Sequence, residues 1–301
     1  MAKKIIHLLK MKNILEYIAF LFIAKVVQLL GVRRLNYPAK ILSFLFFDLL
    51  KIRTQVTFKN LAIAFPDKNQ SELKSIAKQS YFHFSRLILE IMCFPKMSNN
   101  EMSNLLQCPH EDLQLLKDKY NEGLGLIFMT AHFGNWEVGA ISLPMQMGTI
   151  MYPIVKPQRN PYVDKWLNDM REKHGNKVIP LGMSIRKIYQ VLKDNKLLGV
   201  VADQRGPKDG MRVKLFGRDT AIYSGIGDLI IKTKTPLYIL FAVRTSDYKF
   251  SAYAEEINLE ELPQDHNEKV KEIIQRYVNL LEKYVRLYPE QWFWMHNIWK
   301  Y

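Results

Sequence analysis

Residues 124–137 read LGLIFMTAHFGNWE. The first eight residues form a short continuous apolar run, which is typical of a strand buried on both faces of a sheet. Further candidate strands follow at 149–155, 177–180, 197–202, 212–216, 236–243 and 250–256. Helical patterns separate several of these runs. The alternation predicts an α/β fold with a mixed, largely buried sheet flanked by helices.

Helices are predicted on both sides of this first strand. They are expected at 71–93, 98–107 and 110–121 before it, and at 137–147, 160–174, 184–194, 222–234 and 267–288 after it. The helix at 71–93 is expected to open at a Ser-x-x-Lys start rather than at a full capping box.

Composition narrows the class of protein. With 301 residues, 48% hydrophobic and 24% charged, the chain excludes disorder, collagen and coiled coil as whole-chain descriptions. Its two cysteines, Cys93 and Cys108, favour neither a disulfide framework nor a zinc site. No Pro/Gly/Ser linker interrupts the chain. The simplest division is a basic, apolar, membrane-associating helical segment over 1–60 and a catalytic domain over 61–301.

Positive charge gathers near the N-terminus. The net charge is +14, and residues 1–60 carry eleven Lys or Arg but only two acids, Glu16 and Asp48. Such a balance implies a polyanionic partner. Because the basic residues alternate with large aliphatics instead of lining a polar face, an anionic membrane surface fits better than nucleic acid.

The same region holds two apolar runs, Tyr17–Leu30 and Ile41–Leu50. A cleaved signal peptide would need a small-residue cleavage site, which is missing after the first run. Glu16, Lys25 and Gln28 interrupt a full transmembrane span, whereas an interfacial helix pair tolerates such residues. We therefore predict membrane association and leave open whether the first helix spans. A pair of core helices with a solvated basic rim is the alternative.

The chemistry-bearing residues follow the first strand directly. His132 stands at its carboxyl end, where catalytic groups of such sheets concentrate, and Glu137 follows five residues later. The two can meet only if His132 lies in the loop and Glu137 in the first helical turn, with Gly134 and Asn135 supplying the bend and the N-cap. A carboxylate on one imidazole nitrogen leaves the other nitrogen as a general base. A purely structural His–Glu pair is the alternative.

A nucleophilic side chain is not apparent. G-x-S-x-G is missing, and both cysteines lie outside this region. Acyl transfer at such a site would then be direct, from a bound thioester to an acceptor hydroxyl, without an acyl-enzyme. Asp203 follows the apolar run 197–202 at another strand end and is expected to open onto the same cleft as His132.

HFGNWE resembles the H-x-x-x-x-(D/E) motif of glycerolipid acyltransferases, and more narrowly that of the bacterial lipid A biosynthesis acyltransferases. Further segments resemble that family in the right order: RTQVTFKNLAIAFP (53–66), KPQRNP (156–161), ADQRG (202–206), LFG (215–217) and PEQWFWMH (289–296). Three departures touch residues expected near the acceptor. Lys156 replaces an Arg, Arg205 replaces an acid, and residues 296–300 lack two arginines of the family's closing pattern.

The resemblance implies a fatty acyl transfer from acyl carrier protein, or acyl-CoA, to a hydroxyl of a lipid A precursor at the cytoplasmic face of the inner membrane. It implies His132 as base with Glu137 holding it, and no metal or bound cofactor. The expected partners are acyl carrier protein, the membrane surface and an anionic glycolipid acceptor. The expected substrate-binding residues are Asn135, Trp136, Lys156, Arg159, Asn160, Asp203, Gln204 and Arg205.

Three alternatives stay open. The same chemistry could act on another acceptor, such as a lysophospholipid, an amino-acid lipid or a polyene pigment. A non-catalytic membrane-binding scaffold and a hydrolase are the others. His83, His110, His174 and His266 stand in helical or loop contexts without evident partners, and no role is predicted for them.

Overall fold

The structure is a computed structural model that describes residues 2–300, with side chains described from Leu9 onward. Its helices are α1 (Ala2–Leu30), α2 (Asn36–Phe44), α3 (Thr54–Ala64), α4 (Gln70–Cys93), α5 (Asn99–Ser103), α6 (His110–Asn121), α7 (Trp136–Met147), α8 (Pro161–Lys173), α9 (Ile185–Lys193), α10 (Gly225–Thr233) and α11 (His266–Leu287). Its strands are β1 (Leu106–Gln107), β2 (Leu126–Thr130), β3 (Met151–Val155), β4 (Ile179–Pro180), β5 (Leu197–Val201), β6 (Arg212–Leu215), β7 (Arg218–Ala221), β8 (Leu237–Ile239), β9 (Phe241–Arg244) and β10 (Phe250–Tyr253).

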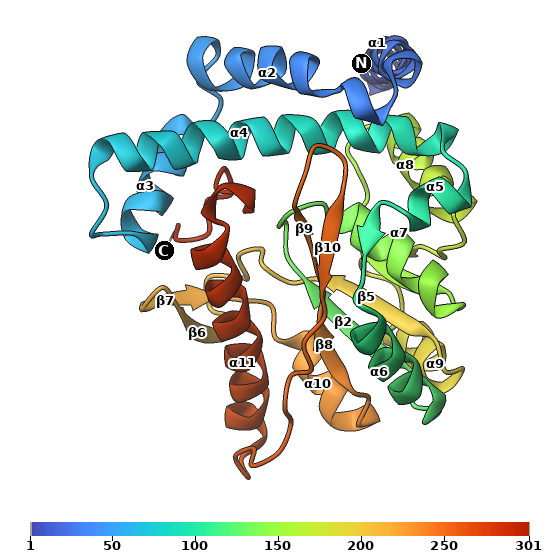
Figure 1. Cartoon of the computed structure of the whole chain (residues 1–301), viewed down its shortest axis with the longest axis vertical. Coiled ribbons are helices and arrows are strands. Elements are labelled where there is room, and N and C mark those ends of the chain that lie inside the picture. Colours follow the sequence, from blue (N-terminus) through green and yellow to red (C-terminus); the bar gives the residue numbers. More distant parts are fainter. Residues whose placement is uncertain (1, 301) are drawn as a thin grey trace.

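A five-stranded parallel sheet with the order β4-β3-β5-β2-β8 forms the centre. β2 lies between β5 and β8, and the predicted strand buried on both faces is confirmed. Ile127 and Met129 face a core that includes residues of α11, while Leu126 and Phe128 face a second core that includes residues of α7. Figure 1 shows α11 on one side of these strands and α6 and α7 on the other. The predicted α/β class is confirmed.

The run at 236–243, expected as one strand, is divided between two sheets. β8 pairs with β2, whereas β9 pairs antiparallel with β10 in a three-stranded sheet of order β1-β10-β9. At the division, the N–H of Leu240 still donates to the carbonyl of Met129. The mixed pairing therefore lies in this smaller sheet, and the five-stranded sheet is parallel throughout.

Two other predictions on secondary structure are wrong in part. The helix expected over 98–107 ends at Ser103, because Leu106 and Gln107 pair with β10 as β1. The helix α4 opens at a full capping box, in which Asn69 accepts from the N–H of Glu72 and the Glu72 carboxylate accepts from the N–H of Asn69. The capping residue thus precedes the expected Ser-x-x-Lys start. The polar strand β7, which pairs with β6, had no apolar run to mark it.

The long helix α4 lies across one end of the sheet, with α1 and α2 on its other side (Figure 1). Ala24, Val27 and Ala39 pack against Leu89 and Met92 of α4 in a small core of their own. This contact explains why α1 and α2 lie on α4. The helix α3 crosses residue 60, the boundary expected between the two parts of the chain.

One helix among the described residues, Leu9–Leu30 of α1, is long and apolar enough to cross a membrane. Most of it is exposed: Leu15 is 64% exposed, Phe22 71% and Leu29 82%. The segment that follows it also exposes large apolar side chains, at Tyr37, Ile41 and Phe44 of α2 and at Leu49, Leu50 and Ile52 after it. Large apolar side chains exposed together in this way are typical of surfaces that contact a membrane or another protein.

Candidate active site

The loop after β2 has the bend that the sequence predicted. Gly134 has a φ of +58°, and a Cβ at this position would overlap the carbonyl oxygen of Ala242. Only glycine combines that φ with so close an approach of two chains. Asn135 is the N-cap of α7, and its side-chain oxygen accepts from the N–H of Val138 at 3.2 Å. The predicted N-cap is confirmed, with Glu137 in the first turn.

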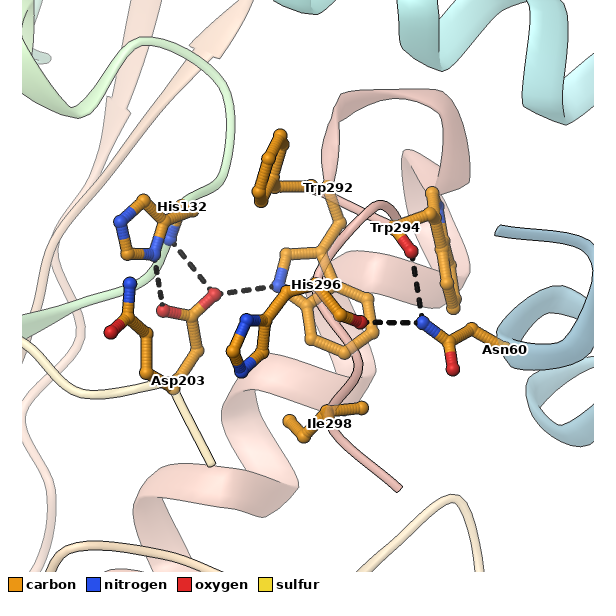
Figure 2. Close-up of a pocket in the computed structure, with 9 residues that line it drawn as sticks. Asn60, His132, Asp203, Trp292, Trp294, His296 and Ile298 are labelled. Atoms are coloured by element: carbon orange, nitrogen blue, oxygen red, sulfur yellow. Dashed lines mark hydrogen bonds and ion pairs between the residues drawn. The ribbon is translucent and has the colours of Figure 1, made fainter. Parts of the chain in front are cut away.

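His132 is paired with Asp203, not with Glu137. Its ring Nδ1 lies 2.8 Å from Oδ1 of Asp203, and its backbone N–H donates to Oδ2 of the same carboxylate at 3.0 Å. Figure 2 shows both contacts. The prediction that Asp203 opens onto the His132 cleft is confirmed. It follows from the pairing of β2 with β5, which places Thr130 beside Val201.

Glu137 instead binds Arg171, in the last turn of α8. The guanidinium donates from Nε at 3.0 Å and from Nη2 at 2.6 Å, one bond to each carboxylate oxygen. The expected His132–Glu137 hydrogen bond is therefore wrong for this structure. A bidentate pair with a permanently charged guanidinium satisfies Glu137 better than a single bond from an imidazole, and Asp203 already occupies Nδ1.

The groups around His132 and Asp203 shift the pKa of both side chains. Burial alone would lower the pKa of His132, but the charge and hydrogen bond of Asp203, with the charge of Glu137, raise it above its ordinary value. Burial would raise the pKa of Asp203. The nearby His132, the Trp292 indole and the backbone N–H of His132 lower it instead. Asp203 is thus held as a carboxylate, which fixes a proton on Nδ1 and leaves Nε2 as the basic nitrogen.

The C-terminal segment completes the support of Asp203. The indole N–H of Trp292 donates to Oδ2 of Asp203 at 2.8 Å. Asn60 of α3 donates from Nδ2 to the carbonyls of Trp294 and His296, at 2.8 and 2.7 Å (Figure 2). Two segments that the sequence singled out, 53–66 and 289–296, therefore hold each other and the site. Trp292 and Trp294 are 4% and 1% exposed, so both rings belong to the core.

His296 is a site residue that the sequence analysis did not select. Its Nε2 accepts from the backbone N–H of Arg205 at 3.1 Å, which leaves the proton on Nδ1. Burial lowers its pKa from the ordinary value. The sequence could have indicated this histidine, because it lies in the PEQWFWMH segment.

Two adjoining hollows share His132. The first has a volume of about 240 Å³ including its mouth, and its lining includes Asp203, Gln204 and His296. The second, of about 220 Å³ again including its mouth, lies between α4 and the loop of His132, and its lining includes His83, Trp136 and Phe293. The ring of Trp136 stands edge-on to His132, with 4.8 Å between ring centres. Of the expected binding residues, Trp136, Asp203 and Gln204 thus lie around His132.

Comparison with known proteins identifies the family of the chain. The family model of the bacterial lipid A biosynthesis acyltransferases matches residues 1–301, the whole chain. The chain belongs to this family.

Individual relatives are distant. The chain is 21% identical over 259 residues to the lipid A biosynthesis lauroyltransferase of Escherichia coli K12, which covers 83% of this chain and 80% of the relative. It is 25% identical over 158 residues to a phosphatidylinositol mannoside acyltransferase of Mycobacterium tuberculosis CDC 1551 / Oshkosh, and the matched residues cover 51% of this chain. The chain spans about half the length of the mycobacterial relatives it matches.

The other residues expected from the resemblance to the lipid A acyltransferases lie apart from His132. Lys156 and Arg159 are exposed and line neither hollow. Asn160 caps α8 and donates to Oε2 of Glu16 at 3.1 Å, so it joins α8 to α1. Among the described residues, no group of three or more His, Cys, Asp and Glu is arranged to hold a metal.

Two further expected residues are turned toward the protein. Asn135 is fully buried, and its amide donates to Oε2 of Glu90 at 2.9 Å. Arg205 donates from its guanidinium to the carbonyl of Asn297. Both side chains are therefore held by hydrogen bonds within the protein.

Proposed function

We propose that this member of the lipid A acyltransferase family transfers a fatty acyl chain from a thioester donor to a hydroxyl of a membrane glycolipid. The observation that carries the proposal is the His132–Asp203 pair, in which Nδ1 of His132 lies 2.8 Å from Asp203 and the ring of His132 lines both hollows. A neutral imidazole held in this tautomer has the equipment of a general base.

In the proposed reaction, Nε2 of His132 removes the proton from the acceptor hydroxyl as its oxygen attacks the thioester carbonyl carbon. The tetrahedral intermediate then collapses, the C–S bond breaks, and the leaving thiolate takes the proton back from the imidazolium. Asp203 stays ionised and stabilises the imidazolium between the two steps. No covalent acyl-enzyme forms, and the base is regenerated.

The oxyanion of the intermediate needs donors near His132. The N–H groups of Gly134 and Asn135 are occupied by the carbonyls of Gln291 and Ala242. The first turn of a helix has no carbonyl partners of its own for its N–H groups, which assigns this role to Trp136 and Glu137. The Glu137–Arg171 pair would then act by fixing this turn, not by touching the imidazole.

We further propose acyl carrier protein as the donor, with acyl-CoA as the alternative, and a lipid A precursor as the first acceptor to test. The net charge of +14 suits both an acidic carrier and an anionic lipid. The names of the Escherichia coli relatives favour lipid A, while those of the mycobacterial relatives favour another glycolipid, phosphatidylinositol mannoside. The exposed apolar surface of α1 and α2 suits an enzyme bound at the inner face of the cytoplasmic membrane.

The test is a transfer assay with purified protein, acyl carrier protein loaded with a labelled chain, and each acceptor in turn, with products identified by mass spectrometry. His132→Ala runs alongside, and His110→Ala, at an exposed position of α6, is the matched control. An acylated lipid A precursor that only His132→Ala abolishes supports the whole proposal. Label in the mannoside or another lipid keeps the chemistry and replaces the acceptor.

Two results would overturn the proposal. Release of free fatty acid alone, dependent on His132, would indicate a hydrolase. Absence of turnover with every donor, while the folded protein binds membrane lipid, would indicate the non-catalytic scaffold.

A further inference from the structure

The second hollow has a wall that the proposed reaction does not use. Ser80, His83, Phe84 and Leu87 follow the i, i+3, i+4, i+7 spacing of one face of α4, and together they line this hollow opposite His132 and Trp136. Three of these four side chains have an evident structural role. Phe84 and Leu87 are apolar, and Ser80 donates to the carbonyl of Trp292 at 3.0 Å. His83 is the polar side chain of this wall that has no evident structural role.

The contrast with other histidines of the chain is informative. His174 is buried and bonded at both ring nitrogens, to the carbonyl of Phe94 and to Oδ1 of Asn99, each at 2.9 Å. His266 is bonded to Asp228 at 2.7 Å. Among the hydrogen bonds of the described residues, none reaches the imidazole of His83, although this side chain is half-buried and lines the hollow. A half-buried imidazole with both nitrogens unused is available to a ligand.

The surroundings keep this imidazole uncharged. Burial, with the nearby charges of Arg244 and Arg86, lowers the pKa of His83 to about 3. Both guanidiniums are fixed in place because they share the carboxylate of Glu90, at 2.7 Å from Arg244 and 3.0 Å from Arg86. A neutral imidazole offers one N–H donor and one acceptor, which match an amide, a carbonyl or a hydroxyl rather than a phosphate.

We propose that His83 is a substrate-binding residue, which forms a hydrogen bond with a neutral polar group of the substrate in the hollow between α4 and His132. The partner is a carbonyl or amide of the acyl donor, or a hydroxyl of the acceptor; Phe84, Leu87 and Phe293 provide the apolar surroundings for the attached chain. The inference rests on the proposed function for the identity of the substrate. It assigns to α4 a direct part in binding.

The first experiment follows binding without turnover. Protein with ring-¹⁵N-labelled histidine is observed by NMR, and the His83 signals are identified by their loss in His83→Gln. A dodecyl thioether of pantetheine is the donor probe, and a synthetic acylated glucosamine disaccharide is the acceptor probe. We expect His83 to keep the spectrum of a neutral ring down to pH 5 and to shift with one probe, which identifies its partner.

The second experiment measures transfer by His83→Phe and His83→Gln. Loss of one hydrogen bond predicts that His83→Phe lowers kcat/KM by roughly 3- to 10-fold, through the KM of the substrate whose probe moved the signal. His83→Gln, which keeps a donor and an acceptor, restores most of it. The acidic limb of the pH profile stays in place, because His83 is neutral throughout. His110→Phe, remote from the hollow, is the matched control and should leave the rate unchanged.

Contrary results are equally clear. If neither probe moves the His83 signals, or if His83→Phe transfers as well as the parent protein, His83 does not bind substrate. A His83 signal that responds to a probe in a protein without turnover would keep this inference and remove the proposed function.

Discussion

Replacing Asp203 by Asn removes the group that holds the imidazole of His132 in its reactive form. The carboxylate accepts three hydrogen bonds, from the backbone N–H and Nδ1 of His132 and from Trp292. An Asn at this position has one acceptor atom. If the amide oxygen takes the place of Oδ2 and keeps its two hydrogen bonds, the amide NH₂ takes the place of Oδ1 and faces Nδ1 of His132. Nδ1 must then accept a hydrogen bond. The proton moves to Nε2, and the base is lost.

The magnitude follows from the part that general base catalysis plays. Such catalysis contributes about 10²- to 10⁴-fold, so we expect kcat/KM of Asp203→Asn to fall by a factor in that range, or about 2.7–5.4 kcal/mol of activation free energy. The pH dependence of kcat/KM gives an independent test, because it reports the direction in which the pKa of His132 changes. The acidic limb of the parent enzyme should lie above pH 6.5, because the pKa of His132 is raised. With the carboxylate gone, burial still lowers that pKa, and the limb moves to lower pH.

The assay is acyl transfer between pH 5 and 9, with thermal unfolding measured on each variant. Asp228→Asn is the matched control, because Asp228 forms a comparable contact with His266 at 2.7 Å on an exposed face. It should leave rate and profile unchanged. A normal rate in folded Asp203→Asn, or a limb that moves to higher pH, would refute the assignment of Asp203.

Three other substitutions test the supports of the site and of the membrane surface. Glu137→Gln weakens the bidentate pair with Arg171, so the free energy of unfolding should fall by about 1.5–3 kcal/mol in a urea titration. Loss of the Glu137 charge should also move the acidic limb to lower pH, but by less than in Asp203→Asn, because Asp203 raises the pKa of His132 more than Glu137 does. Trp292→Phe keeps the ring but loses the bond to Asp203, and kcat should fall about tenfold while both KM values stay unchanged. Phe22→Ser should weaken sedimentation with anionic vesicles by about 1.5–3 kcal/mol, whereas Leu115→Ser, at a site 66% exposed on α6, should not.

The sequence correctly predicted that the site lies at the ends of buried strands, but it did not predict correctly which side chains are hydrogen-bonded there. A continuous apolar run followed by a loop glycine places His132 at the end of a buried strand, and the same rule places Asp203 at the end of the neighbouring one. Choosing between Glu137 and Asp203 required more. The bond made by Glu137 depends on Arg171, thirty-four residues further along and in another helix. Nothing local in the sequence marks that contact.

Similar reasons apply to the elements that were misjudged. The strand expected at 236–243 changes sheets at Leu240, because β9 has β10 and not β2 as its partner. The pairing of Leu106 with Phe250 likewise stops the helix expected over 98–107. Periodicity identifies which residues are buried, but the partner of a strand is a long-range property. His83 belongs to the same class, since only the packing of α4 brings it beside His132.

The N-terminal helices and the site are joined through one buried carboxylate. Glu90 of α4, 1% exposed, accepts from Arg86, Arg244 and Asn135. Arg86 also donates to Asn36, the first residue of α2, while Asn135 caps the helix that follows His132. Removing one partner of such a buried pair costs about 3–5 kcal/mol, since a charge is left unpaired. A continuous set of hydrogen bonds thus runs from α2, beside the exposed apolar surface, to the loop of His132. Through this set, Asn36 of the N-terminal segment is joined to the support of the site.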